Sequence, residues 1–219
     1  LDLVGHGHSS HLAPSGDYTA SGSVELVLDF AKSQNLDSFH LVGHSLGAGI
    51  SALTAGVIPE RIKSLTLIEG VGPISSPKEE LPERFLKHYK IKFRKLLTQK
   101  PSYKSHEEAA LDRHVKSGLS LKSSKILATR GLEETKENLF TWRTDPRLLA
   151  PTAHPFTEEE VILFLERITA KTKIILGSNS WLKKYKAVEE RIKFIKNASV
   201  ITFEGDHHIH MEKPKEVAE

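Results

Sequence analysis

Residues 39–49 constrain the fold of this chain more than any other stretch. The run Phe39–Val42 is short and apolar, as expected of a β-strand, and an apolar, small-residue run typical of a helix extends from Ala48 to Val57. Between them, residues 43–47 read Gly-His-Ser-Leu-Gly, which matches the pattern Gly-x-Ser-x-Gly. The chain must turn sharply here from strand to helix, and this turn holds Ser45 in a strained conformation with its hydroxyl exposed.

The residues around Ser45 have a chemical consequence. We expect a side chain at Gly43 or Gly47 to collide with the turn, so that only glycine fits at either position. Ser45 is then a candidate nucleophile, and the backbone N–H of Leu46 is a candidate donor to a developing oxyanion. The alternative is a plain Gly/Ser turn before a buried helix; the flanking strand and helix patterns favour the nucleophile.

The composition excludes several classes of protein. In 219 residues, 38% are hydrophobic and 27% charged, which is ordinary for a soluble protein. A net charge of +3 is too small to indicate nucleic acid as a partner. No apolar run approaches the roughly 18 residues that span a bilayer. The absence of cysteine fits a reducing compartment, and we expect a cytoplasmic protein.

Strand and helix patterns alternate along the chain. Further strand-like runs stand at 64–69, 173–177 and 198–203, and helical patterns at 21–32, 157–165 and 181–196. This alternation predicts an α/β fold with a doubly wound, mostly parallel sheet. The chain begins at Leu1 without methionine, inside a strand-like run to Val4, and we expect it to be a piece of a longer protein.

The segment 73–157 differs in composition from the rest and predicts a helical insertion. We expect core segments at 1–72 and 158–219, with 73–157 as a lid. Its first helical pattern has an apolar face (Leu81, Phe85, Tyr89, Phe93, Leu96 and Leu97) and an opposite basic face (Lys87, Lys90, Arg94 and Lys95). Such a helix can bind a membrane surface, but a solvated outer face is more common, and we expect no membrane partner.

Three motifs together resemble the α/β-hydrolases. They are Gly5-His6-Gly7-x-Ser9, the Gly-His-Ser-Leu-Gly turn, and Gly205-x-His207-x-x-His210-x-Glu212-x-Pro214, in the order and spacing of that family. The segment Trp142–Leu149 and the His-x-x-His-Met ending are most similar to the serine hydrolase-like branch. The resemblance covers nearly the whole chain and implies an α/β-hydrolase fold that lacks its N-terminal strands.

The resemblance places the general base of a triad at His207, two residues after Gly205, with His208 and His210 as competitors. A metal site built from residues 206–210 is an alternative, but nothing elsewhere in the sequence supplies a further ligand, so we expect no metal and no cofactor. His210 is more typical of a structural residue.

The acid of the triad departs from the common pattern. Many members of the family carry an aspartate in the loop after the strand that follows the lid, but residues 177–181 read Gly-Ser-Asn-Ser-Trp. Glu69 ends the strand that follows the helical run 48–57, where other members of the family place the acid. A buried glutamate without a partner is energetically costly. We therefore predict that Glu69 orients His207; the alternative is that it caps a lid helix or pairs with an arginine.

A serine nucleophile implies an acyl-serine intermediate and cleavage of a carboxylic ester, thioester or amide of a small molecule. The predicted substrate-binding residues are Trp142, Trp181, Phe85 and His44. The second oxyanion donor is expected upstream of Leu1. Two alternatives remain open: a non-catalytic ligand-binding protein on the same fold, and a C–C bond hydrolase or perhydrolase with the same triad. The oligomeric state is not indicated.

Overall fold

The computed structural model describes residues 1–219 and divides into two compact units. Unit 1 consists of residues 1–18 and 82–153, and unit 2 of residues 19–81 and 154–219. The division differs from the predicted one in two respects: residues 1–18 group with the helical segment, and residues 73–81 and 154–157 group with the core. That 73–157 acts as a lid stays a prediction.

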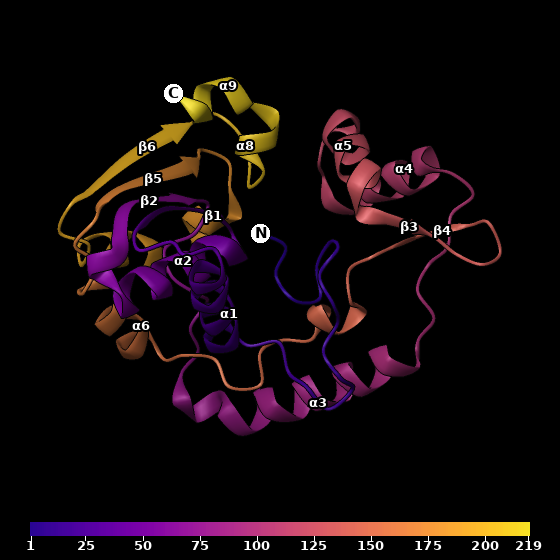
Figure 1. Ribbon diagram of the computed structural model, residues 1–219, viewed down its shortest axis with the longest axis horizontal. Coiled ribbons are helices and arrows are strands. Elements are labelled where there is room, and N and C mark those ends of the chain that lie inside the picture. The colour runs from indigo at the N-terminus through magenta and orange to yellow at the C-terminus, as the bar shows by residue number, and fades with distance from the viewer. The chain divides into compact units, whose positions relative to one another are not determined.

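Unit 2 is built on a parallel sheet of four strands in the order β1-β2-β5-β6 (Figure 1). The strands are β1 Phe39–His44, β2 Ile62–Ile68, β5 Lys171–Gly177 and β6 Ala198–Phe203. Every strand pair is parallel, with Leu41 opposite Leu65 and Ile174 opposite both Leu67 and Val200. The α/β prediction with a mostly parallel sheet is therefore confirmed. Because all strands point the same way, their carboxyl ends share one edge of the sheet.

Unit 2 also contains six α-helices and three 3₁₀ turns. They are α1 Ala20–Ser33, α2 Leu46–Val57, α6 Glu158–Leu165, α7 Ala187–Ile192, α8 Ile209–Glu212 and α9 Pro214–Ala218, with 3₁₀ turns η1 Pro59–Arg61, η2 Lys78–Glu80 and η4 Trp181–Lys184. Thr157 forms a capping box with Glu160 at the start of α6. The single helix predicted at 181–196 is wrong: Tyr185 leaves the helical region at φ −89° and ψ 89°, which separates η4 from α7.

The core of unit 2 lies between α2 and the sheet. Ala48, Ala52 and Leu53 on α2 are at most 1% exposed, as are Leu65 and Leu67 on β2. Small residues let α2 approach its neighbours closely; a Cβ at Gly56 would stand 2.4 Å from a backbone oxygen of α6. This close packing holds the start of α2 against the ends of β1 and β2.

A buried arginine joins distant parts of unit 2. Arg191 on α7 is 1% exposed and donates hydrogen bonds to the carbonyl oxygens of Val71 and Pro73, each at 2.8 Å. Its other nitrogens bind the carboxylate of Glu158 at 2.7 and 2.8 Å. The segment that leaves β2 is thereby tied to both α6 and α7.

Unit 1 is mostly helical. Its elements are α3 Leu81–Leu97, α4 His106–Ser117, α5 Leu121–Gly131, η3 Pro146–Leu149 and an antiparallel hairpin of β3 Leu132–Glu134 and β4 Phe140–Trp142. The hairpin was not predicted. Phe140 and Trp142 of the hairpin pack against a small core that consists of Tyr103, Ala109, Ala110, Ala128 and Leu132. None of the helices in the chain is both long and apolar enough to cross a membrane.

The N-terminal residues of unit 1 do not form the strand predicted at Leu1–Val4. A strand needs a hydrogen-bonded neighbour, whereas here the Asp2 carboxylate binds Arg130 at 2.7 and 2.9 Å. Further along, Tyr18 donates to Asp145 at 2.6 Å, and the same carboxylate pairs with the buried Arg147. These contacts explain why the first 18 residues group with the helical segment.

Candidate active site

Ser45 stands at the turn between β1 and α2 in a strained backbone conformation, with φ 52° and ψ −113°. A Cβ at Gly43 would lie 2.3 Å from the carbonyl oxygen of Gly47, so the prediction that Gly43 must be glycine is confirmed. The same prediction for Gly47 is wrong, because a Cβ there would meet no atom within 4 Å. Only one of the two glycines is required by close approach to the turn.

His207 lies in the loop after β6 and faces the serine. Its Nε2 is 2.8 Å from the Oγ of Ser45, although 162 positions separate the two residues in the sequence. The competitors have other surroundings: the ring of His210 packs on His44 with centroids 4.1 Å apart, and that of His208 packs edge-on against His207. The geometry therefore places His207, of the three histidines, as the partner of Ser45.

Glu69 follows β2 directly, at φ 55°, and is fully buried. Its Oε2 is 3.0 Å from the Nδ1 of His207. Two further groups donate to the same carboxylate, the backbone N–H of Gly177 and the hydroxyl of Ser180. The side-chain partners of the buried Glu69 carboxylate are thus His207, Gly177 and Ser180, rather than an arginine or a helix of the predicted lid.

The surroundings of Glu69 favour its charged form. Burial alone would raise the pKa of this carboxyl, but the hydrogen bonds from His207, Ser180 and Gly177 outweigh burial and hold the pKa below its ordinary value. A charged carboxylate at Nδ1 selects the histidine tautomer with its proton on that nitrogen. The free lone pair of Nε2 then points at the Ser45 hydroxyl and can accept its proton.

With this geometry established, comparison with known proteins gives the family. The family model described as the alpha/beta hydrolase fold matches residues 1–214. The chain belongs to the α/β-hydrolase family. Unit 1, unit 2 up to Pro214, the elbow at Ser45 and the histidine loop after β6 fall within the matched residues.

Individual relatives of this α/β hydrolase agree with that assignment. A serine hydrolase-like protein of Dictyostelium discoideum is 27% identical over 97% of this chain, which spans 62% of that relative's length. A probable alcohol acetyltransferase of Wickerhamomyces anomalus is 30% identical over 56% of this chain and 36% of its own length. Among solved structures, a hypothetical protein from Pseudomonas aeruginosa PAO1 is 29% identical with a TM-score of 0.90, covering 99% of this chain and 77% of that one.

His44 of this α/β hydrolase is turned toward the histidine loop. Its Nε2 lies 2.7 Å from the carbonyl oxygen of His207, so the N–H on that nitrogen can donate to the backbone of the loop. Burial lowers the pKa of His44 to about 4 and keeps the ring neutral near pH 7. This hydrogen bond helps to hold the loop that carries His207. Substrate binding by His44 stays a prediction.

The three predicted aromatic pocket residues lie in different surroundings. Trp181, at the start of η4, is 44% exposed, and its ring centroid is 5.4 Å from that of His207. Trp142 belongs to unit 1 and packs against the core of the hairpin and helices there. Phe85 lies on α3 and is 58% exposed. As substrate-binding residues, all three stay predictions.

Gly177 and Ser180 are functional candidates that the sequence reasoning missed. Gly177 is the last residue of β5, and Ser180 lies in the loop that follows it, which has no carboxylate. Ser180 is 3% exposed and also accepts the backbone N–H of Leu182 at 3.1 Å. A buried carboxylate at the end of one parallel strand needs hydrogen-bond donors from the end of the neighbouring strand. A serine and a glycine N–H at that position could therefore have been predicted as partners of Glu69.

Leu46 is the first residue of α2, where a backbone N–H has no partner within the helix. The N–H therefore remains available beside Ser45, and the positive end of the helix dipole adds to its effect on a nearby negative charge. Although four histidines gather here, no group of three or more possible ligands in residues 1–219 is arranged to hold a metal ion.

Proposed function

We propose that this α/β hydrolase cleaves a carboxylic ester, or a related thioester or amide, of a small apolar substrate through an acyl-serine intermediate. The observation that supports this function is the continuous hydrogen-bonded series from Ser45 through His207 to Glu69, at 2.8 and 3.0 Å. Each member has the environment that its proposed role requires: a strained serine, a histidine held in one tautomer, and a buried, charged carboxylate.

The proposed reaction proceeds in two halves. The Oγ of Ser45 attacks the substrate carbonyl carbon while Nε2 of His207 takes the hydroxyl proton, and Glu69 stabilises the resulting imidazolium. The N–H of Leu46 donates to the oxyanion of the tetrahedral intermediate. Collapse breaks the bond to the leaving group, which receives the proton from His207. A water molecule, deprotonated by His207, then attacks the acyl-serine and releases the acid.

Trp181 supports the apolar part of the proposal. Its ring stands beside His207, the residue that must protonate the leaving group, and it is exposed enough to contact a bound molecule. We assign it as one wall of the site for the acyl or alcohol part. The substrate is then a small molecule with an apolar group next to its carbonyl, and the chemistry needs only water as a second reactant.

The same residues are compatible with other functions. The relative named as a probable alcohol acetyltransferase raises transfer to an alcohol in place of water, which needs no change in the triad. A loop after β5 without a carboxylate would favour a non-catalytic binding protein, but the 3.0 Å contact between Glu69 and His207 supports catalysis. C–C bond cleavage and perhydrolysis have no separate observation in their favour.

The test is labelling of the full-length protein with a fluorophosphonate probe, which reacts with activated serines. We expect Ser45→Ala to abolish labelling and turnover of an activated short-chain ester, because the nucleophile is gone. The control is Ser33→Ala, which removes an exposed hydroxyl at the end of α1 and should label as the parent does. Labelling that persists in Ser45→Ala would mean another nucleophile. Adding ethanol to the ester assay distinguishes transfer from hydrolysis by the product formed.

A further inference from the structure

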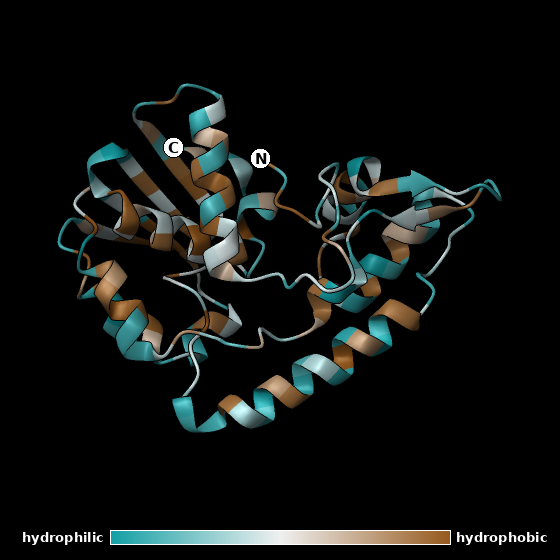
Figure 2. Cartoon of the chain, turned by 60° about the horizontal axis from the view of Figure 1, so that its bottom comes forward, coloured by the Kyte–Doolittle hydropathy of each residue, from teal (hydrophilic) through white to brown (hydrophobic).

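The helix α3 exposes its apolar side. Phe85, Leu86, Tyr89, Phe93, Leu96 and Leu97 are each between 42% and 73% exposed. We call these six residues the α3 apolar face. Their spacing of three and four positions places them along one side of the helix. In Figure 2, hydrophobic (brown) and hydrophilic (teal) segments alternate along this long helix. Together they expose several hundred Å² of apolar surface, as much as interaction sites commonly do.

The side of α3 that contacts the rest of unit 1 is polar instead. His88 is 8% exposed, and the N–H on its Nδ1 donates to the carbonyl oxygen of Pro151 at 2.8 Å. Lys92 donates to the carbonyl oxygen of Ser15 at 3.2 Å and forms an ion pair with Asp17. A surface helix ordinarily turns its apolar stripe inward and its charges outward. In α3 this order is reversed, so packing within unit 1 does not explain the apolar face.

Basic side chains lie beside and behind the α3 apolar face: the helical spacing puts Lys90 at its edge, and Arg94 and Lys87 further round toward the opposite side. Lys87, Lys90 and Arg94 are all exposed on α3. The helix carries six basic residues and one acid, Glu83, whereas the entire chain has a net charge of only +3. A partner for this surface must therefore be apolar and negatively charged. A second copy of α3 does not meet the second condition, because it carries the same excess of positive charge.

We propose that the α3 apolar face binds the surface of an anionic phospholipid bilayer, with the helix lying in the plane of the interface. The aromatic and leucine side chains enter the boundary between headgroups and acyl chains, and the lysines and arginine contact the lipid phosphates. We expected no membrane partner because the basic face of such a helix is more often simply solvated; in the structure the apolar face is exposed as well. A helix on the surface is also consistent with a chain in which no helix crosses a bilayer.

The experiment is sedimentation of the full-length protein with vesicles. One set contains phosphatidylcholine with about 30% phosphatidylserine, and the other phosphatidylcholine alone. We expect at least about tenfold tighter binding to the anionic vesicles and weaker binding as salt is raised, since part of the attraction is electrostatic. Binding should be unchanged in Ser45→Ala, so failure of this proposal and failure of the proposed reaction are separate results.

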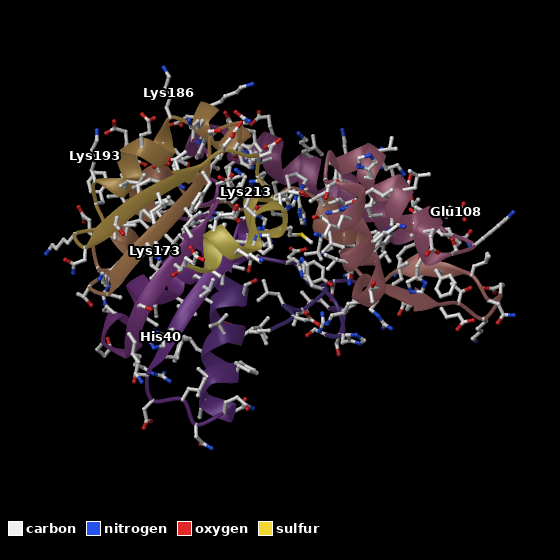
Figure 3. All side chains as sticks on the ribbon, turned by 90° about the horizontal axis from the view of Figure 1, so that it is seen from above. His40, Glu108, Lys173, Lys186, Lys193 and Lys213 are labelled. Carbon is white, nitrogen blue, oxygen red and sulfur yellow. The ribbon has the colours of Figure 1, made fainter.

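Variants assign the binding to α3. Tyr89→Ser with Phe93→Ser removes two aromatic members of the face. Lys87→Glu with Lys90→Glu and Arg94→Glu reverses the charge of three basic side chains on the same helix. We expect each to weaken binding to anionic vesicles at least about tenfold. The matched control makes the same change of charge in unit 2, at Lys183, Lys184 and Lys186, all exposed. Figure 3 shows Lys186 extending outward. Circular dichroism and the melting temperature check that every variant folds.

Three outcomes would overturn the proposal. The first is equal binding, or none, to the two kinds of vesicle. The second is a loss in the unit 2 control as large as in the α3 variants, which would make the attraction a property of net charge. The third is a concentration-dependent dimer that Tyr89→Ser with Phe93→Ser dissociates, without vesicle binding by the parent protein. That result would assign the face to contacts between copies.

Discussion

Glu69 is the residue on which the proposed chemistry depends most. We predict that Glu69→Gln lowers kcat on an activated ester by about 10³-fold or more, because an amide cannot stabilise the imidazolium and no longer selects the correct tautomer. The measurement is steady-state kinetics of the full-length protein. Glu190→Gln is the control, since Glu190 is exposed and pairs only with a surface lysine in its own helix region. A fall of about threefold or less would assign the acid to another residue.

His44 makes stability depend on pH. The folded protein binds a proton at His44 only at about pH 4, whereas an ordinary histidine binds it at 6.5. The unfolded chain therefore binds more protons in this window, so the stabilisation is complete above pH 6.5 and is lost as pH falls toward 4. Burial also lowers the pKa of His210, which adds a loss of the same sign.

The variant that tests this is His44→Gln, which keeps an N–H donor near the carbonyl oxygen of His207 but does not titrate. We expect the free energy of unfolding of the parent to fall by on the order of 2 kcal/mol more than that of the variant between about pH 7 and pH 4. Chemical denaturation at a series of pH values measures both. Identical pH dependence in the two proteins would show that His44 is not the group responsible.

At the scale of elements, the turn from β1 to α2 offers a matched pair of glycines. A Cβ at Gly43 would overlap backbone atoms of Gly47, and backbone cannot move aside as a side-chain end can. We predict that Gly43→Ala lowers the free energy of unfolding by about 2–3 kcal/mol. Gly47→Ala should be neutral or stabilising by up to about 1 kcal/mol, because its Cβ meets open space and alanine favours the helix. Equal effects in urea denaturation would contradict this description of the turn.

At the scale of the whole molecule, a few buried side chains connect segments far apart in the sequence. Arg191 binds Glu158 and two carbonyl groups after β2, so its removal leaves several polar groups of unit 2 without partners. We predict that Arg191→Ala lowers the free energy of unfolding by about 3 kcal/mol. Replacing the exposed Lys193, which pairs with Glu190, by alanine should lower the free energy of unfolding by less than about 0.5 kcal/mol. Figure 3 shows Lys193 at the outside of the molecule. Comparable losses in the two variants would refute the assignment.

Much of unit 2 could be predicted from local patterns. The strands and the elbow at Ser45 depend on hydrophobic runs and on backbone sterics among neighbouring residues, and these are visible in the sequence. The strand at Leu1–Val4 and the continuous helix at 181–196 were predicted in the same way and are wrong. The first segment has no neighbouring strand to pair with. The second is interrupted where the backbone of Tyr185 leaves the helical region.

By itself, the sequence determined the strand–turn–helix at Ser45 and the order in which the serine, the carboxylate and the histidine occur. Only the tertiary structure decided that Ser180 and Gly177 hold the carboxylate of Glu69, and that α3 turns its apolar face outward. The reason is the range of the interactions involved. Backbone sterics act between adjacent residues, whereas Glu69 and His207 are 138 positions apart and meet because parallel strands end at one edge of a sheet.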